Sequence, residues 1–280
     1  MRSWNVFFII VYKRLQNIIN NDIKYNGKIM NILISNDDGI EAEGIQSLAK
    51  ALKNIANVTV AAPLYERSGA SQSLTIHQPM QVKEVVRNGE FLGYGINGSP
   101  ADCIKLALFD ICKEKPDYII SGINKGPNNA CNIHYSGTVG AAAEGAVNGI
   151  MSFAVSLTGY HHKDYSVSAD FMKDFIQKAH LIPKTSLLYN INIPPLKKEE
   201  IQGVRWTRAS QYSYLLNYDK GVDPFGEDFY WLADFREPEH IDKWTDDGAL
   251  SENYISITPL LMDRTDYKAL EQIQKLGDIW

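Results

Sequence analysis

Two adjacent carboxylates, Asp37 and Asp38, follow a short apolar run at residues 30–35 and are followed in turn by Gly39. Neighbouring carboxylates repel each other and lose solvation on burial, so such a pair persists most easily with a cation bound to it. An ordinary turn is the alternative interpretation, because Asp and Gly are common turn residues. The pair by itself favours the turn, so the choice depends on what lies near it in the fold.

Two further loops carry oxygen donors after predicted strands. One loop, residues 63–71, lies at and after the end of the predicted strand 57–63. The other, residues 121–128, lies at and after the end of the predicted strand 116–124. Both loops are rich in polar residues and glycine. In an open α/β sheet the carboxyl ends of parallel strands meet at one edge, where ligands bind. Carboxylate, amide and hydroxyl oxygens suit Mg²⁺ or Mn²⁺ rather than a thiolate zinc site. We therefore expect a hard-cation site at Asp37 and Asp38, with Glu41 and Glu43 in a solvated first helical turn.

The segment YSGTVGAAAEG at 135–145 places Ser, Gly and Thr directly before a run of Ala and Gly. Free backbone N–H groups and two hydroxyls at the start of a helix can bind a phosphate. An N-cap followed by a tightly packed helix explains the same residues equally well. The segment alone does not separate these two interpretations.

Several common catalytic motifs are absent. There is no GxGxxG directly after the first strand, no GxxxxGK[ST] and no GxSxG, which argues against a dinucleotide-binding fold, a P-loop and an α/β-hydrolase. Adjacent aspartates also lack the two-residue spacing of an aspartyl-phosphate phosphatase. His161 and His162 follow a predicted strand, where a polar loop pair is favoured over a general base. His77 and His134 lie in or near the candidate loops, and the sequence assigns them no role.

The scaffold that must position these residues begins at Met30, where strand-like and helix-like segments start to alternate. Apolar, β-rich runs predict buried strands, and apolar residues with helical spacing predict helices that face a sheet. The predicted strands are 30–35, 57–63, 116–124, 151–157 and 186–194, and the predicted helices are 45–55, 99–112, 138–150 and 165–182. Asn88 and Gly89 predict a hairpin turn. The order indicates an α/β fold with a doubly wound, mostly parallel, Rossmann-like sheet.

The two ends of the chain differ from this α/β core, which is predicted to span 30–195. Residues 1–29 contain an apolar run at 5–12 that is too short to span a bilayer, so an extension outside the fold is expected, with an interfacial anchor as the alternative. Residues 196–280 hold aromatic, strand-like stretches and a helical pattern at 263–280. They predict a β-rich arm and a terminal helix that serve oligomerisation.

Composition restricts the class of partner. The 280 residues include 28 basic and 33 acidic side chains, and this net charge of −5 argues against a nucleic-acid duplex. Cys103, Cys112 and Cys131 form no metal-binding or disulfide pattern, which predicts free thiols in a reducing compartment. No apolar run approaches membrane length, so a cytoplasmic protein without a membrane partner is expected.

From Met30 to the C-terminus the chain resembles the SurE (survival protein) family of metal-dependent 5′/3′-nucleotidases. The resemblance rests on NILISNDDGI at 31–40, VAAPLYERSGASQSLT at 60–75, NGSPADCIKLAL at 97–108, SGINKGPN at 121–128 and YSGTVGAAAEG at 135–145, with ISITPL at 255–260 as a weaker match. It implies a SurE-like fold, one divalent cation per subunit (Mg²⁺, Mn²⁺ or similar) and a homodimer or homotetramer.

The resemblance also implies roles for individual residues. It places the metal ligands on Asp37, Asp38, Ser68 and Asn124, with the two aspartates also taking part in catalysis. The residues expected to receive the phosphate of the substrate are Asn128, Ser136, Gly137 and Thr138.

One loop departs from the family pattern N-x-G-x-N-x-G-x-D. Asn124, Gly126 and Asn128 match this pattern, whereas Ala130 replaces the last glycine and Asn132 replaces the aspartate. The loop is expected to differ in shape, because a glycine there permits a positive φ.

We therefore predict a metal-dependent phosphomonoesterase that hydrolyses nucleoside 5′-monophosphates, with 3′-monophosphates as further candidate substrates, to nucleoside and phosphate. The alternative is a non-catalytic nucleotide- or metal-binding module, which would release no phosphate. The base preference, the choice between 5′ and 3′ esters, and the native metal are left open by the sequence.

Overall fold

The structure, a computed structural model, describes residues 29–211, 217–233 and 241–277. One nine-stranded sheet forms the centre of the molecule, in the order β3-β4-β2-β1-β5-β6-β7-β11-β8. Its strands are β1 (Met30–Ser35), β2 (Ala56–Pro63), β3 (Val82–Arg87), β4 (Glu90–Ile96), β5 (Tyr118–Lys125), β6 (Met151–Leu157), β7 (Leu188–Ile193), β8 (Val204–Trp206) and β11 (Ile255–Leu260). The predicted core strands lie within about two residues of these bounds.

Strand β1 lies at the topological switch point of the sheet. The chain passes from β1 to β2 on one side and later to β5 on the other, and β1 pairs in parallel with both. The pairs β2–β4, β5–β6 and β6–β7 are also parallel, whereas β3 and β11 run antiparallel to β4 and β7. The predicted doubly wound, mostly parallel sheet is confirmed. Ligands of such sheets bind beside the switch point, which here means the loops after β1 and β5.

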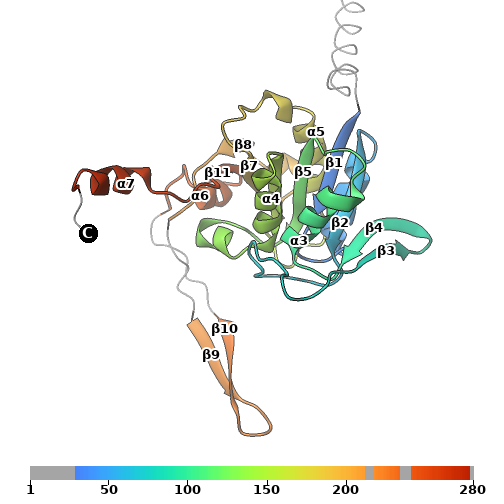
Figure 1. The fold of residues 1–280 in the computed structure, drawn as a ribbon, viewed down its shortest axis with the longest axis horizontal. Helices are drawn as coiled ribbons and strands as arrows, with labels where there is room; N and C mark the ends of the chain where they lie inside the picture. The colour runs from blue at the N-terminus through green and yellow to red at the C-terminus, as the bar shows by residue number, and fades with distance from the viewer. Residues whose placement is uncertain (1–28, 212–216, 234–240, 278–280) are drawn as a thin grey trace, which may run out of the picture.

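Helices cover both faces of the sheet (Figure 1). On one face α2 (Glu43–Leu52) and α5 (Ser166–Ile176) pack against each other, and on the other α3 (Pro100–Leu106) packs against α4 (Gly137–Val147). Helix α2 buries Ile45, Leu48 and Leu52, as their spacing predicts. Helix α4 is buried along residues 137–146, because its Ala and Gly residues let it fit closely between its neighbours.

Two local signals in the sequence produce the expected backbone. Asn88 and Gly89 have φ values of 53° and 79°, and this left-handed pair closes the β3–β4 hairpin as predicted. Helix α3 begins with a capping box between Ser99 and Asp102. The α-helical part of the segment predicted at 99–112 ends early, because residues 107–111 form a wider π-helical turn.

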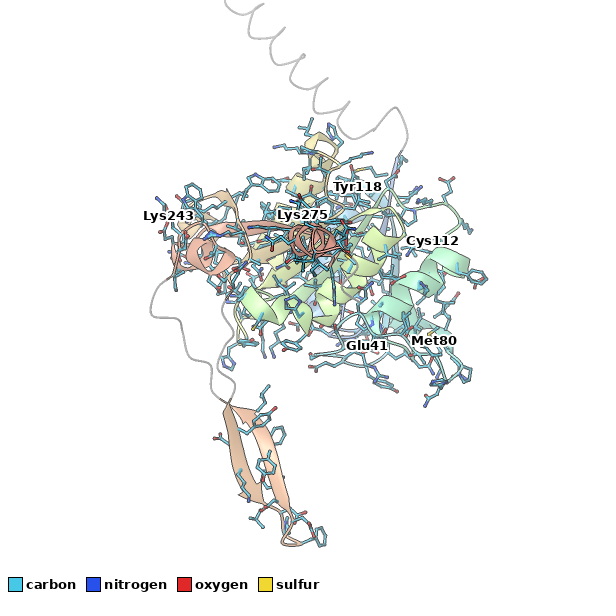
Figure 2. All side chains as sticks on the ribbon, turned by 60° about the vertical axis from the view of Figure 1, so that its left-hand side comes forward. Glu41, Met80, Cys112, Tyr118, Lys243 and Lys275 are labelled. Carbon is cyan, nitrogen blue, oxygen red and sulfur yellow. The ribbon has the colours of Figure 1, made fainter. Side chains whose placement is uncertain are left out.

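The segment after residue 195 contributes to the main sheet as well as to a separate hairpin. Strand β11 pairs with β7, and β8 pairs with β11, so the sheet continues past the predicted core boundary. Strands β9 (Asn217–Val222) and β10 (Asp228–Ala233) form a two-stranded hairpin that projects from the body in both views (Figures 1 and 2). Helix α6 (Asp246–Ser251) precedes β11, and α7 (Tyr267–Gln274) lies within the predicted terminal helix. How the chain divides into folding units stays a prediction.

A chain that begins at Met30 is expected to keep the melting temperature and the activity of the full chain. The sheet starts at Met30, and Ile29 beside it is half exposed. Thermal unfolding and phosphate release of the shortened chain measure this. A large loss of melting temperature would show that the apolar run at 5–12, which lies outside the described residues, docks into the core. No helix in the described part of the chain is both long and apolar enough to cross a membrane.

Candidate active site

The loop after β1 presents Asp37 and Asp38 at the carboxyl end of the sheet. Asp37 is 4% exposed, and Asp38 is partly buried. The Asn36 side-chain amide donates to the carbonyl of Gly39 at 2.9 Å and folds the loop back on itself. Gly39 has a φ of +100°, which a residue with a side chain rarely adopts. Figure 2 shows Glu41, just beyond this loop, at the lower edge of the body and Tyr118, the first residue of β5, nearer the opposite edge.

The charges of the two aspartates oppose each other in this setting. Burial raises the pKa of Asp37 above its ordinary value, and hydrogen bonds from Thr138 partly offset this effect. Burial, and then the neighbouring charge of Asp37, raise the pKa of Asp38 to about 7. A cation placed between the carboxylates would relieve both the desolvation and the repulsion.

The loop after β2 is tied directly to the aspartates. The backbone N–H of Arg67 donates to the carbonyl of Asp37 at 2.7 Å. Ser68, the next residue, is exposed, and its hydroxyl donates to Glu66 Oε1 at 2.8 Å. Donation by this hydroxyl leaves its oxygen lone pairs able to coordinate a cation.

The end of β5 brings Asn124 to the same place. The β5–β6 pairing shifts register between Ser121 and Asn124, and such a bulge re-aims the side chains that follow it. The backbone N–H of Lys125 donates to Asp38 Oδ2 at 3.2 Å. Asn124 donates from Nδ2 to the carbonyl of Gly126 at 2.8 Å, which leaves Oδ1 as the side-chain atom suited to coordination.

The start of α4 packs against Asp37. The Thr138 hydroxyl donates to Asp37 Oδ1, so its proton is already used. Ser136 caps the helix by accepting from the backbone N–H of Val139 at 3.1 Å. A Cβ placed on Gly137 would lie 2.8 Å from the Cβ of Asp37, so glycine is what permits this approach. The sequence is compatible with either an N-cap or a phosphate site at this position, and the structure shows that the cap is present.

Asn128 lies deeper in the fold than the other predicted phosphate ligands. It is 6% exposed, its Nδ2 donates to Ser156 Oγ at 2.8 Å, and its backbone N–H donates to Asn192 Oδ1 at 2.9 Å. These contacts fix the loop after β5 to β6 and β7. They leave the second Nδ2 proton of Asn128 as its remaining side-chain donor.

The donor set is compatible with a hard cation. The described residues hold no cluster of three or more His, Cys, Asp or Glu side chains that could bind a metal, so a cation would need neutral oxygens beside Asp37 and Asp38. The Ser68 hydroxyl and Asn124 Oδ1 are such oxygens. Asn36 Oδ1 is also buried beside the pair without a hydrogen-bond partner in the described part of the chain.

A family model described as "Survival protein SurE" matches residues 32–215. The chain belongs to the SurE family. It is 42% identical over 254 residues to "5'-nucleotidase SurE" of Synechococcus sp. (strain JA-3-3Ab), covering 89% of this chain and 98% of that relative. It is 43% identical over 252 residues to the protein of the same name from Pelotomaculum thermopropionicum, covering 88% and 95%. The crystal structure of the SurE protein from Aquifex aeolicus superposes with a TM-score of 0.78 at 38% identity, covering 89% of this chain and all of that one.

The departure from the SurE loop pattern at Ala130 has a structural consequence. Ala130 has a φ of 47°, a left-handed conformation that costs an alanine about 1 kcal/mol relative to glycine. Ala130→Gly is therefore expected to stabilise the protein by roughly 1 kcal/mol, or about 2 °C in melting temperature. Thermal unfolding measures this, with the helical Ala143→Gly as control. The control should lose about 1 kcal/mol, and a loss in both variants would contradict the account.

A second pair of aspartates holds this SurE loop in place, and sequence reasoning missed it. Asp246 accepts from the backbone N–H of Ala130 at 3.0 Å and from that of Ser210 at 2.9 Å. Asp247 accepts from the side-chain amide of Asn129. Burial, with the adjacent Asp247, raises the pKa of Asp246. The repeated Asp-Asp-Gly at 246–248 was the available signal, but its distance along the chain from the loop hid the contact.

Proposed function

We propose that this chain is a metal-dependent phosphomonoesterase that hydrolyses nucleoside 5′-monophosphates to nucleoside and phosphate. The observation that carries the proposal is the convergence of three other segments of the chain on Asp37 and Asp38. The loop after β2, the end of β5 and the start of α4 each hydrogen bond to Asp37 or Asp38. The 5′-nucleotidase name of the SurE relatives supports the same activity.

The proposed ligands of the divalent cation are Asp37, Asp38, Ser68 and Asn124. A bound cation of this kind polarises the phosphoryl group and lowers the pKa of a coordinated water. Asp37 and Asp38 supply the charge that holds it, while Thr138 keeps the Asp37 carboxylate oriented. Either aspartate can also orient the attacking water, because each carboxylate has lone pairs beyond those its hydrogen bonds use.

The proposed phosphate ligands divide into two groups by their contacts. Ser136 accepts a hydrogen bond and keeps its own O–H to donate, and the backbone N–H of Gly137 lies in the first turn of α4, where such groups lack helical partners. These two are suited to contact phosphate oxygens directly. Asn128 and Thr138 are engaged within the protein, so their proposed part is mainly to hold the loop and the helix in place.

We also propose that the chain is at least dimeric. The β9–β10 hairpin exposes Phe225, Tyr230 and Trp231, and two-stranded hairpins are marginal in water without a surface to pack on. Light scattering at micromolar concentration should give at least twice the chain mass of 31.5 kDa. A monomer under these conditions would contradict the proposal.

The alternative function is a binding module without turnover. Phosphate release from 5′-AMP and 3′-AMP separates the two, because a module would bind the nucleotide and release nothing. Release from 3′-AMP would extend the substrate range. The location we propose is the cytoplasm, since Cys103, Cys112 and Cys131 are all free thiols.

A further inference from the structure

A cavity of about 450 Å³ opens directly beside Asp38. Its walls come from the loops after β1 and β2, the end of β5 and the segment between β6 and α5. Lys125 belongs to this wall, and its backbone N–H donates to Asp38 Oδ2 at 3.2 Å. Cavities of roughly 300–1,000 Å³ accommodate small ligands. A molecule whose phosphate lies at the aspartates therefore has room for the rest of its structure here.

Tyr160 is the aromatic side chain that this cavity presents to a ligand. It is 50% exposed, whereas Tyr165 in the same wall is 7% exposed. One side of the Tyr160 ring lies against Gly126, where an added Cβ would be 2.4 Å from Cε1, 2.9 Å from Cδ1 and 3.0 Å from Cζ. The backbone N–H of Gly126 donates to the carbonyl of Leu157 at 2.8 Å. The ring is thus supported by backbone that is tied to the end of β6.

This support matters for recognition. A flat ring that is fixed on one side and open on the other can stack a second flat ring without first losing much conformational freedom. Stacking of a base on an aromatic side chain is tolerant of base identity, because every base has a π-face. The polar residues His161 and His162 line the same cavity and can meet the edges of such a base.

We propose that Tyr160 stacks on the nucleobase of the substrate and that this cavity is the nucleoside subsite. The inference rests on the proposed function, because it takes the phosphate to lie at Asp37 and Asp38. It adds that the base contributes to binding through a residue outside the metal and phosphate sites. The predicted polar loop pair at 161–162 then belongs to the wall of this subsite.

The test compares two phosphate esters in the full chain. AMP carries a base, and ribose 5-phosphate has the same ester without one. Tyr160→Ala should raise KM for AMP about tenfold, at the low end of measured stacking losses, with kcat little changed. KM for ribose 5-phosphate should change less than twofold, and Tyr160→Phe should retain AMP binding because it keeps the ring.

The controls separate the failure of this inference from that of the proposed function. Phe109→Ala removes an aromatic side chain that is 86% exposed and outside the cavity wall, so it should alter neither substrate's KM. If Tyr160→Ala raises KM equally for both esters, or for neither, the subsite is wrong while the phosphatase stands. If the unaltered chain hydrolyses neither ester, the proposed function itself is overturned, and this inference with it.

Discussion

Asp37→Asn should lower AMP hydrolysis by well over 100-fold while the protein stays folded. The substitution is nearly isosteric, so packing changes little, but it removes a charge that a hard cation prefers in its ligands. Changes to groups that only support metal ligands already cost about 10–100-fold, so loss of a direct ligand should cost more. Asp38→Asn is expected to behave alike. The measurement is phosphate release from AMP against Mg²⁺ or Mn²⁺ concentration.

Ser68→Ala is the matched comparison for this first prediction. Its hydroxyl is neutral and exposed, so water can replace it, and excess Mn²⁺ should restore activity more readily than in Asp37→Asn. Thermal unfolding in chelator is the fold control.

The raised pKa of Asp38 also predicts how the stability of the metal-free protein depends on pH. The charged form of this carboxyl group destabilises the folded state, so the free energy of unfolding should fall as the pH rises from about 4 through about 7. Asp38→Asn should therefore melt higher than the unaltered chain at pH 8. Full activity in Asp37→Asn would contradict the metal site and would show that Asp37 and Asp38 only form a turn.

Gly140→Ala should destabilise the protein by about 1–3 kcal/mol and sharply reduce activity. An added Cβ at Gly140 would lie 2.2 Å from the carbonyl oxygen of Ser71, which is backbone and cannot rotate away. Ser71 is itself held against the segment before α4. Its backbone N–H donates to the carbonyl of Tyr135 at 3.0 Å, and its hydroxyl donates to the carbonyl of His134 at 2.8 Å. The new methyl group must therefore displace the loop that carries Ser68.

The control for Gly140→Ala is Val147→Ala at the end of the same helix. Val147 is 59% exposed, so its truncation should change neither the melting temperature nor phosphate release appreciably. Melting curves and AMP turnover of both variants are compared with the unaltered chain. A Gly140→Ala protein with normal stability and activity would show that the close contact between α4 and the Ser71 loop is unimportant.

The central sheet was predictable from the sequence because its strands are continuous apolar runs and its helices have amphipathic spacing. The β3–β4 hairpin was also predictable from neighbouring residues, because Asn88 and Gly89 readily adopt the positive φ values that its turn requires. The pairing of β11 with β7 was not predictable, because it joins residues more than 60 positions apart through contacts that no local pattern encodes. The π turn at 107–111 was not predictable either, because its residues fit the same helical pattern as those of α3 before it.

Local chemistry indicated the position of the candidate site but not its internal contacts. Adjacent aspartates after a strand stand out in any sequence, and the carboxyl ends of β2 and β5 follow from the sheet order. The hydrogen bond from Thr138 to Asp37 could not be predicted from the sequence, because the two residues are 101 positions apart. Asp246 was missed for the same reason, although it holds the backbone of Ala130.

Phosphate release from AMP by the exhaustively chelated chain tests the metallophosphatase account most directly. The chain is stripped of divalent cations, assayed, and then titrated with Mg²⁺ or Mn²⁺ while bound metal is measured in parallel. The account predicts no release after stripping and full recovery when about one cation is bound per chain, with no recovery in Asp37→Asn at the same concentrations. Undiminished hydrolysis by the stripped chain would contradict it.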